Sequence, residues 1–567
     1  MKWVFTENKI LESKFFSILK DKMQFPDYLI GVFANRGIDS EEKLEQIFKI
    51  DEIQLHSPFL FEDMEKVIAR INKAIDNKEK IVIYGDYDVD GVAAIVILMK
   101  FFKDFLKYNN IDYYIPHRQE EGYGLNIEAI KYLKSQNVSL VITVDCGISA
   151  KEEIDYCSQI GIDVIITDHH IPEESKISTN AIAIINPKVS KLYPDKDLSG
   201  VGVAYKLLCA IAEKKNISIN DEFLDFVALG TVADIVPVSN ENRIIIRRGL
   251  QKIKNTKNPG LVELKNVSGI SDGIDISTYH IGYILGPRIN AAGRIEHANQ
   301  AVKLFLSTNQ DEIKILAQNL NSTNEERKKQ MKSIEEQAML LLNNTFKQEE
   351  DFIITIYNEE WNAGIIGLVA SRLTRQYNRP TFVMTKSEDG LVHGSGRSIP
   401  TIDLYDILKN VDKYLVKYGG HKLAAGISLK FEDIENFKKY SNNYLKSIKS
   451  LEDFEPQLYI DAVIKENINF KDIKILEKLK PWGIGNPEPV FVMENVFIKE
   501  VKYLKNNTLK FYGIFGQRYY NFILYNYCES DKEKIQQGQI INVAFTPVIN
   551  FWNDEEQMVF EVEDVQL

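Results

Sequence analysis

Cysteine is scarce in this sequence and scattered along it. The 567 residues contain four cysteines, and no two of them form a C-x-x-C pair. Such spacing offers no zinc-binding framework and fits a reducing compartment. Apolar runs long enough to cross a membrane are missing as well, and the first residues lack the apolar core of a secretion signal. We therefore expect a soluble, cytoplasmic protein.

Positive charge is outweighed by negative charge. The chain carries 69 lysines and arginines against 81 aspartates and glutamates, which gives a net charge of −12. This balance argues against a protein that coats nucleic acid, although an enzyme can still carry a local basic groove. The sequence also has no internal repeat and no low-complexity tract. Its length and its 44% hydrophobic content predict about three or four domains with well-filled cores.

The stretch from Ile81 to Gly91, IVIYGDYDVDG, carries the first chemical signal. Its apolar half predicts a buried strand, after which Asp86, Asp88 and Asp90 stand at every second position and a helix is predicted to follow. Three carboxylates this close repel one another, so without a cation some of them would hold a proton. Mg²⁺ or Mn²⁺ suits such hard oxygen ligands. Taken alone, the run also fits a solvated acidic turn; a calcium loop is excluded, because its twelfth position is Ile97 in place of glutamate.

Strands and helices are predicted to alternate through residues 81–235. The predicted strands are Ile81–Tyr84, Asp112–Ile115, Leu140–Val144, Asp163–Thr167 and Ala181–Ile185. This alternation indicates an α/β fold with a mainly parallel, doubly wound sheet, in which ligands lie beyond the carboxyl ends of the strands.

Three of these strands run directly into acidic residues. The first is followed by Asp86, the third by Asp145, and the fourth by Asp168, His169 and His170. Because parallel strands end at the same edge of a sheet, we expect these side chains to converge there.

A fourth carboxylate comes from an apolar helix predicted over Phe223–Val236. It is Asp234, near the C-terminal end of that segment. A carboxylate in such surroundings needs a partner, which is either a metal or a capping or salt-bridge contact.

Eight segments in a fixed order resemble a known family. GDYDVDG at 85–91, VDCGIS at 144–149, TDHH at 167–170 and GTVADIVP at 230–237 together resemble the motif set of the DHH phosphoesterases. Four more segments resemble the bacterial RecJ exonucleases of that family: IPHRQEEGYGLN at 115–126, GPRINAAGRI at 286–295, HGSGRSI at 393–399 and GGHKLAAG at 419–426. The resemblance covers nearly the whole chain.

The resemblance implies a catalytic centre with two Mn²⁺ or Mg²⁺ ions. The catalytic residues it implies are Asp86, Asp88, Asp90, Asp145, His169, His170 and Asp234, all but His170 as metal ligands. Asp88 would serve one metal, Asp90 the other, and Asp145 would bridge them. His169 and Asp234 would complete the second site. A histidine ligand favours Mn²⁺ over Mg²⁺.

The resemblance also implies contacts with DNA. The residues concerned are Arg118, Tyr123, Arg288, Asn290, Ser395, Arg397 and His421. Arg118, Ser395 and Arg397 would bind a 5′ phosphate, for which the guanidinium fork is well suited. Tyr123 would stack on the terminal bases, and stacking tolerates any sequence.

Five segments with different patterns predict the domain organisation. They are an N-terminal helical cap (1–75), the DHH catalytic domain (76–300), helical connectors (301–349), a smaller DHH-associated α/β domain (350–450) and an OB-type β-barrel that binds nucleic acid (451–567). The barrel is predicted from short alternating strands separated by turns.

The main interpretation is a metal-dependent exodeoxyribonuclease that removes mononucleotides from the 5′ end of single-stranded DNA in repair and recombination. The expected partners are single-stranded DNA, a single-strand-binding protein and a RecQ-type helicase, and the protein is expected to be a monomer. A second interpretation is a DHH enzyme for short RNA, a cyclic dinucleotide or pyrophosphate; such relatives are generally shorter and lack the barrel. A third, a non-catalytic DNA-binding scaffold, is disfavoured because all the implied ligands are present.

Overall fold

The computed structural model describes residues 1–567 apart from 7–13, 118–120, 272, 296, 388 and 553–554. The chain divides into two compact units. One contains Met1–Leu55, Pro237–Arg247 and Pro456–Leu567, and the other contains His56–Val236 and Arg248–Glu455. Among the described residues, no helix has both the length and the apolar character needed to cross a membrane.

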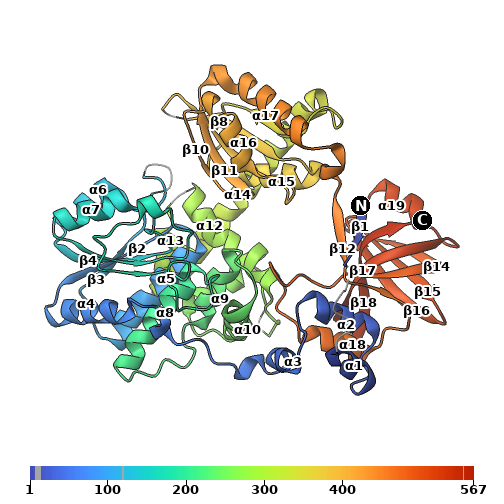
Figure 1. The fold of residues 1–567 in the computed structure, drawn as a ribbon, viewed down its shortest axis with the longest axis horizontal. Helices are drawn as coiled ribbons and strands as arrows, with labels where there is room; N and C mark the ends of the chain where they lie inside the picture. Colours follow the sequence, from blue (N-terminus) through green and yellow to red (C-terminus); the bar gives the residue numbers. More distant parts are fainter. Residues whose placement is uncertain (7–13, 118–120, 272, 296, 388, 553–554) are drawn as a thin grey trace. The chain divides into compact units, whose positions relative to one another are not determined.

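The larger unit begins with a five-stranded parallel sheet in the order β3-β2-β4-β5-β6 (Figure 1). Its strands are β2 (Lys80–Gly85), β3 (Ile111–Tyr114), β4 (Val138–Val144), β5 (Asp163–Thr167) and β6 (Ala183–Ile185). The helices around it are α4 (Met64–Asp76), α5 (Val89–Lys100), α6 (Ile127–Ser135), α7 (Lys151–Gln159), α8 (Gly200–Lys214) and α9 (Leu224–Ala233). The predicted strands and the doubly wound topology are thus confirmed.

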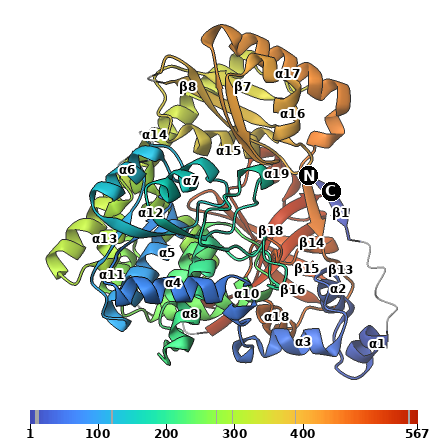
Figure 2. The same cartoon turned by 60° about the vertical axis from the view of Figure 1, so that its left-hand side comes forward.

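The two faces of this sheet are covered by different helices (Figures 1 and 2). Val82 and Tyr84 point into a core shared with α6 and α7, and α5 and α8 pack on the other face. Because the side chains of Ile81–Tyr84 are apolar on both faces of the sheet, helices must cover both faces to bury them.

Further helices lead from this sheet to a second one. They are α10 (Asn240–Lys254), α11 (Pro259–Val267), α12 (Gly286–Ile295), α13 (Asn299–Leu306) and α14 (Gln310–Thr345). A π-helix, His280–Leu285, precedes α12 directly. The predicted long helical connector corresponds to α13 and the 36-residue α14.

The second sheet of this unit is mixed, in the order β10-β11-β9-β8-β7. Its elements are β7 (Ile354–Tyr357), α15 (Ile366–Tyr377), β8 (Thr381–Lys386), β9 (Val392–Arg397), α16 (Leu404–Asn410), β10 (Lys417–Gly420), β11 (Ala424–Leu429) and α17 (Ile434–Ile448). α15 shares a core with α14 on one face, whereas α16 and α17 pack on the other.

The smaller unit is built on a closed barrel. Strands β14, β15, β16, β18 and β17 are paired in that order, and a β14–β17 pairing closes the ring. The bounds are β12 (Gln457–Ile460), β13 (Ala462–Ile464), α18 (Phe470–Glu477), β14 (Phe491–Leu504), β15 (Thr508–Phe515), β16 (Arg518–Tyr525), α19 (Glu529–Lys534), β17 (Ile540–Trp552) and β18 (Glu555–Gln566). The predicted OB-type barrel is confirmed.

The N-terminal segment packs against this barrel. It forms β1 (Lys2–Phe5), α1 (Lys14–Asp21), α2 (Asp27–Asn35) and α3 (Glu41–Phe48). The Tyr28 hydroxyl donates to Asp472 at 2.6 Å, and Arg36 pairs with Asp461 at 3.0 Å. In addition to these polar contacts, apolar residues of α2 and of the barrel share one hydrophobic core.

Candidate metal centre

The acidic strand ends meet at one edge of the parallel sheet. β2, β4 and β5 are neighbours, and each is followed directly by an acidic residue: Asp86, Asp145 and Asp168. All three side chains are buried. The convergence predicted from the strand ends is therefore present.

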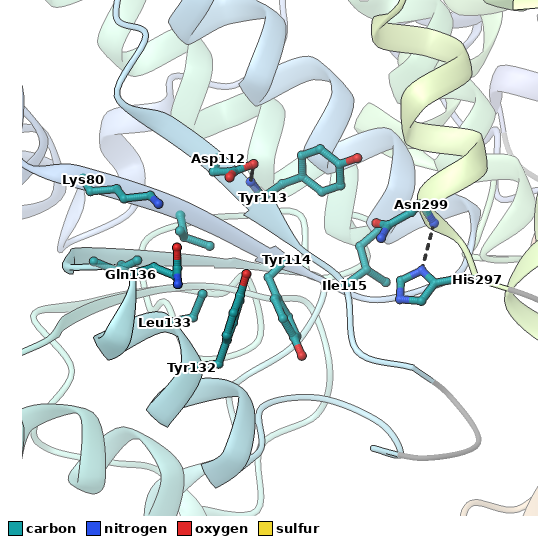
Figure 3. A pocket seen from close by; sticks show the side chains of 12 residues that line it. Lys80, Asp112, Tyr113, Tyr114, Ile115, Tyr132, Leu133, Gln136, His297 and Asn299 are labelled. Carbon is teal, nitrogen blue, oxygen red and sulfur yellow. Dashed lines mark hydrogen bonds between the residues drawn. The ribbon is translucent and has the colours of Figure 1, made fainter. Parts of the chain in front are cut away.

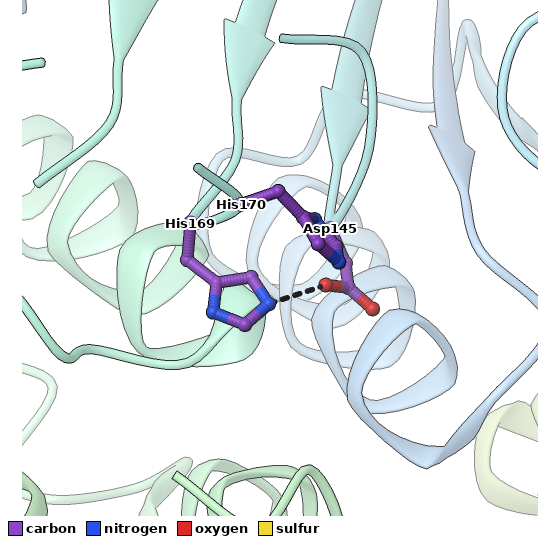
Figure 4. A group of neighbouring side chains, drawn as sticks. All are labelled: Asp145, His169 and His170. Carbon is purple, nitrogen blue, oxygen red and sulfur yellow. Dashed lines mark ion pairs between the residues drawn. The ribbon is translucent and has the colours of Figure 1, made fainter. Parts of the chain in front are cut away.

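The side chains form three overlapping groups of potential metal ligands. Within each group the ligand atoms all lie within 4.8 Å of one another. The groups are Asp86, Asp88 and Asp145; Asp90, His169 and Asp234; and Asp145, His169 and His170 (Figure 4). Asp145 thus links the first group to the histidines, and the six residues implied as ligands all take part.

Helix N-termini orient two of these carboxylates. Asp88 caps α5, and its Oδ1 accepts from the backbone N–H groups of Asp90 at 2.9 Å and Gly91 at 3.1 Å. Asp90 in turn accepts from Gly200 at 2.6 Å and Val201 at 2.9 Å, at the start of α8. Helix starts present unpaired N–H groups and positive dipole ends, so these carboxylates are held in fixed positions.

Close packing of two glycines makes room for the ligands. A Cβ on Gly200 would lie 2.6 Å from Oδ1 of Asp145, and a Cβ on Gly230 would lie 2.6 Å from Oδ1 of Asp90. Any larger residue at either position would displace a ligand.

Asp145 itself has a strained backbone. Its φ is 59°, a left-handed conformation that costs a non-glycine residue about 1–2 kcal/mol. Its N–H donates to the Thr167 carbonyl at 3.1 Å, which ties the end of β4 to the end of β5. Strain of this kind concentrates at functional sites.

The chemistry of the donor atoms fits a divalent cation. Nε2 of His169 lies 3.2 Å from Oδ1 of Asp145 and 3.5 Å from Oδ2 of Asp234. All three atoms are buried, and the described part of the chain offers none of them a hydrogen-bond partner. Burial lowers the pKa of His169 to about 3, and its other ring nitrogen bonds the backbone of Leu198. Nε2 therefore directs a lone pair at two carboxylate oxygens, an arrangement that Mn²⁺ would stabilise.

Asp168 has a positioning role that sequence reasoning missed. Its Oδ1 accepts from the backbone N–H groups of His169 at 2.7 Å and His170 at 3.1 Å, and lies 2.7 Å from Nδ1 of His170. Its Oδ2 accepts from the Ile148 N–H at 2.9 Å. Although burial acts to raise it, the hydrogen bond and charge of His170 hold the pKa of Asp168 below its usual value. Its place in the sequence could have indicated this role, because Asp168 directly follows a buried strand and directly precedes two histidines.

Tyr123 reaches this centre from the segment between β3 and α6. Its hydroxyl donates to the carbonyl oxygen of Asp145 at 3.2 Å and lies 3.4 Å from both ring nitrogens of His170. The side chain is 52% exposed, so a base can reach it. Arg118, also predicted to bind DNA, lies outside the described residues.

Arg288 and Asn290, on α12, hold other parts of the protein in place. Arg288 donates from Nη1 to the Ile284 carbonyl at 2.7 Å and from Nε to Asn321 at 3.0 Å. Oδ1 of Asn290 accepts from the Val89 N–H, at the start of α5, at 3.1 Å. α12 therefore supports the acidic loop, while the DNA contacts expected of both residues stay predictions.

Ser395 and Arg397 lie side by side on β9. Nη1 of Arg397 donates to Oγ of Ser395 at 3.1 Å and to the carbonyl of Gly396 at 2.7 Å. A Cβ on Gly367, in the first turn of α15, would lie 2.8 Å from Oγ of Ser395 and 3.3 Å from Nη2 of Arg397. A helix start beside an arginine favours an anion. His421 is exposed and follows β10 in the same sheet.

A separate pocket of about 440 Å³ lies beside β3 (Figure 3). Its lining includes Lys80, Tyr114, Tyr132 and His297. None of the residues predicted to bind metal lines it. This concavity is therefore distinct from the acidic cluster.

Three family models match the chain. They are the DHH family N-terminal domain at residues 80–231, the DHHA1 domain at 350–447 and the RecJ OB domain at 460–564. The single-stranded-DNA-specific exonuclease RecJ of Bacillus subtilis (strain 168) is 33% identical over 550 residues, which cover 96% of this chain and 69% of that protein. This chain belongs to the RecJ family.

Solved RecJ structures have the same fold. The crystal structure of RecJ in complex with Mn²⁺ from Thermus thermophilus matches with a TM-score of 0.83 at 24% identity, and the match covers 100% of this chain and 79% of the other. A structure of exonuclease RecJ bound to manganese matches with a TM-score of 0.59 at 28% identity, covering 69% of this chain and 98% of the other. Both proteins hold manganese, the ion that the donor set described above fits.

Stability of this RecJ-family protein without metal is predicted to fall as pH rises. Burial and neighbouring carboxylates raise the pKa of Asp90 to about 7 and that of Asp234 to about 9, from 3.8. Above about pH 4 the folded state therefore keeps protons that the unfolded chain releases. The stabilisation from these protons is complete below about pH 4 and falls as the pH rises; the part from Asp90 is lost by about pH 7 and the part from Asp234 by about pH 9. Urea unfolding in EDTA between pH 5 and 9, with Asp90→Asn and Asp234→Asn as comparisons, measures the effect. The prediction is contradicted if the free energy of unfolding of the wild type falls with pH no more steeply than that of the variants.

Proposed function

We propose that this protein is a single-stranded-DNA-specific exonuclease that releases mononucleotides from the 5′ end by metal-dependent phosphodiester hydrolysis. Its role would lie in DNA repair and recombination. Hydrolysis would belong to residues 76–300, with the connectors at 301–349 and the domain at 350–450 completing the site, and strand binding would extend to 451–567.

One observation carries this proposal: two groups of mostly buried potential metal ligands, joined through Asp145 and His169. Asp86 and Asp88 share one group with Asp145, while His169 belongs both to the group of Asp90 and Asp234 and to a group with Asp145. Carboxylates that serve two groups hold two cations close together, as hydrolysis of phosphodiesters by paired metals requires. We infer two Mn²⁺ ions, with Mg²⁺ as the alternative.

The metals, when bound, supply an activated water and stabilise the charge that develops on the phosphate. The protein supplies placement. Asp88 and Asp90 are fixed by the first turns of α5 and α8. Although burial acts to lower it, the hydrogen bond and charge of Asp168 raise the pKa of His170. A protonated His170, held by Asp168, can donate to a phosphate oxygen next to the ligands.

The preference for a 5′ end would come from Ser395 and Arg397 beside the first turn of α15, together with Arg118 and His421. The Arg397 fork and the helix start both favour a terminal phosphate. Tyr123 would stack on a base while its hydroxyl stays near Asp145. Neither the phosphate contacts nor the stacking contact distinguishes one base from another, which suits an exonuclease without sequence preference.

The barrel presents lysines and tyrosines on its outer surface. Tyr519, 61% exposed, lies with its ring centroid 4.7 Å from Nζ of Lys499. Tyr512 lies 5.5 Å from Lys502 and 5.2 Å from Lys510. By contrast, Phe491, Phe511, Tyr520, Phe522, Phe545 and Phe560 lie in the core of the barrel. The surface rings interleaved with positive charge suit a single strand.

Replacing Tyr519 by alanine is predicted to weaken binding of single-stranded DNA. Loss of one stacking ring should raise the dissociation constant by about fivefold to tenfold. Fluorescence anisotropy of a labelled oligothymidine, in EDTA, measures it. Tyr519→Phe keeps the ring and should bind like the wild type; if both variants bind equally, the ring makes no contact with the strand.

A DHH enzyme for short RNA or a cyclic dinucleotide is the competing function, and the complete barrel argues against it. We further propose single-strand-binding protein and a RecQ-type helicase as partners, a monomeric state and a cytoplasmic location.

The proposed function is tested with single-stranded DNA labelled at one end, purified protein and Mn²⁺. Duplex DNA and an RNA strand serve as controls. Release of mononucleotides from the 5′ end of the single strand alone supports the proposal. Hydrolysis of short RNA or a cyclic dinucleotide, with the DNA strand intact, would overturn it.

A further inference from the structure

Two tyrosines outside the predicted site stand exposed on the catalytic unit. Tyr279 and Tyr283 are 59% and 66% exposed. Their rings stack, with centroids 5.0 Å apart and an interplanar angle of 26°. Large aromatic side chains are usually buried to a greater extent, and a stacked pair that faces solvent offers a flat apolar surface to a planar ligand.

A π-helix presents this pair. It spans His280–Leu285, with Tyr279 as the preceding residue. π-helical turns are rare and are frequent at functional sites. Arg288 fixes the end of the turn through its bonds to the Ile284 carbonyl and to Asn321 of α14. The turn that presents the tyrosines is therefore bonded at its end by an arginine that was predicted to meet the DNA.

The π-helix leads directly to the ligand-bearing backbone. Gly286 stands three residues after Tyr283, and a Cβ on Gly286 would lie 3.7 Å from Cβ of Ala233 and 3.8 Å from Cγ2 of Val89. Ala233 immediately precedes Asp234, and Val89 stands between two other ligands. The π-helix that presents the pair packs against α9, which ends immediately before Asp234, whereas Tyr123 contacts Asp145 and His170.

Positive charge lies on α12, which follows the π-helix directly, and on α14, which packs against α12. Arg327 on α14 lies near Arg288 on α12, and Glu325 lies near both guanidinium groups. Because Lys328 also pairs with Glu325 at 2.8 Å, positive groups outnumber the carboxylate, and the cluster favours an anion such as a backbone phosphate. Flat rings on one element and guanidinium groups on the adjoining helices suit the bases and phosphates of a single strand.

We propose that Tyr279 and Tyr283 form a second base-stacking site for the single-stranded substrate, on the Asp90–His169–Asp234 side of the metal centre. The proposal rests on the proposed function and extends it, because the strand would then be held by Tyr123 at one side of the reacting phosphate and by this pair at the other. The occupant is a nucleobase of any sequence.

The first test measures binding without hydrolysis. Wild type and Tyr279→Ala/Tyr283→Ala are titrated in EDTA against a fluorescein-labelled, 5′-phosphorylated oligothymidine. The double variant should bind about tenfold or more weakly. Tyr279→Phe/Tyr283→Phe retains the rings and should restore binding, which a purely structural defect would not predict. Tyr132→Ala, which removes a tyrosine that is 54% exposed on α6, is the matched control.

The second test locates the base. An oligonucleotide that carries 5-iodouracil is irradiated with the wild-type protein, and cross-linked peptides are mapped. Cross-links at Tyr279 or Tyr283 support the site. Equal binding by the alanine and wild-type proteins, or cross-links confined to other segments, would overturn it. If the protein binds and cross-links as expected but fails to hydrolyse single-stranded DNA, the proposed function fails while the stacking site stands.

Discussion

Replacing Asp145 by asparagine should abolish hydrolysis of single-stranded DNA. Its Oδ1 lies 3.2 Å from Nε2 of His169, and its carboxylate belongs to two of the ligand groups. An amide keeps the shape of the side chain but removes the charge that would hold two cations together. Losing paired-metal stabilisation costs several kcal/mol in the transition state, so kcat/KM should fall by at least about a thousandfold.

Two further readouts separate loss of metal from loss of fold. Without metal, burial and the surrounding carboxylates raise the pKa of Asp145 well above its usual value. The neutral amide should therefore leave the metal-free protein as stable as the wild type, while the rise in Tm on adding Mn²⁺ should shrink. Binding of single-stranded DNA in EDTA should persist. Asp104→Asn, on an exposed carboxylate, is the matched control. Near-normal hydrolysis by Asp145→Asn would overturn the metal assignment.

The strands that carry the acidic residues were predictable because their signals are local. Continuous apolar runs such as Ile81–Tyr84 indicate strands buried on both faces, and the alternation with helices requires parallel order. Parallel order alone brings Asp86, Asp145 and Asp168 to one edge. The convergence of the candidate ligands thus follows from period and topology without knowledge of any contact.

Contacts between distant segments were not predictable in the same way. β1 pairs in parallel with β12, with Lys2 opposite Gln457, and nothing in the first residues indicates that partner. Likewise, the Asn290 side chain accepts from the N–H of Val89, 201 positions earlier in the chain, where sequence similarity implied only a contact with DNA. Propensity and periodicity report on neighbours in the chain, whereas such bonds depend on how whole elements pack.

The exposed pair Tyr279 and Tyr283 is another feature that could not be predicted from the sequence. Tyr279 and Tyr283 are four residues apart, a spacing that would place both rings on one face of an α-helix. In the structure the residues that follow Tyr279 form a π-helix, and both rings are exposed. Only the three-dimensional structure therefore reveals the ring pair.

Replacing Arg397 by alanine should remove most of the preference for a 5′-phosphorylated end. Its guanidinium lies next to Ser395 and the first turn of α15, where its charge and the helix start would act on the same phosphate. Hydrogen bonds to charged groups contribute about 1.5–3 kcal/mol, so kcat/KM for the 5′-phosphorylated strand should fall by about tenfold to a hundredfold. The strand with a 5′ hydroxyl should change little, because it has no terminal phosphate to lose contact with.

A second variant separates the effect of the planar guanidinium from the effect of its positive charge. Arg397→Lys keeps the positive charge but loses the planar fork, and should recover only part of the preference. Arg375→Ala removes an exposed arginine from the same helix that approaches Arg397, and should leave both substrates unaffected. If Arg397→Ala slows the phosphorylated and hydroxyl strands by the same factor, Arg397 contributes to general strand binding and the 5′ phosphate binds elsewhere. A selective loss would mean that direction is set by an anion site on β9, outside the sheet that carries the candidate metal ligands.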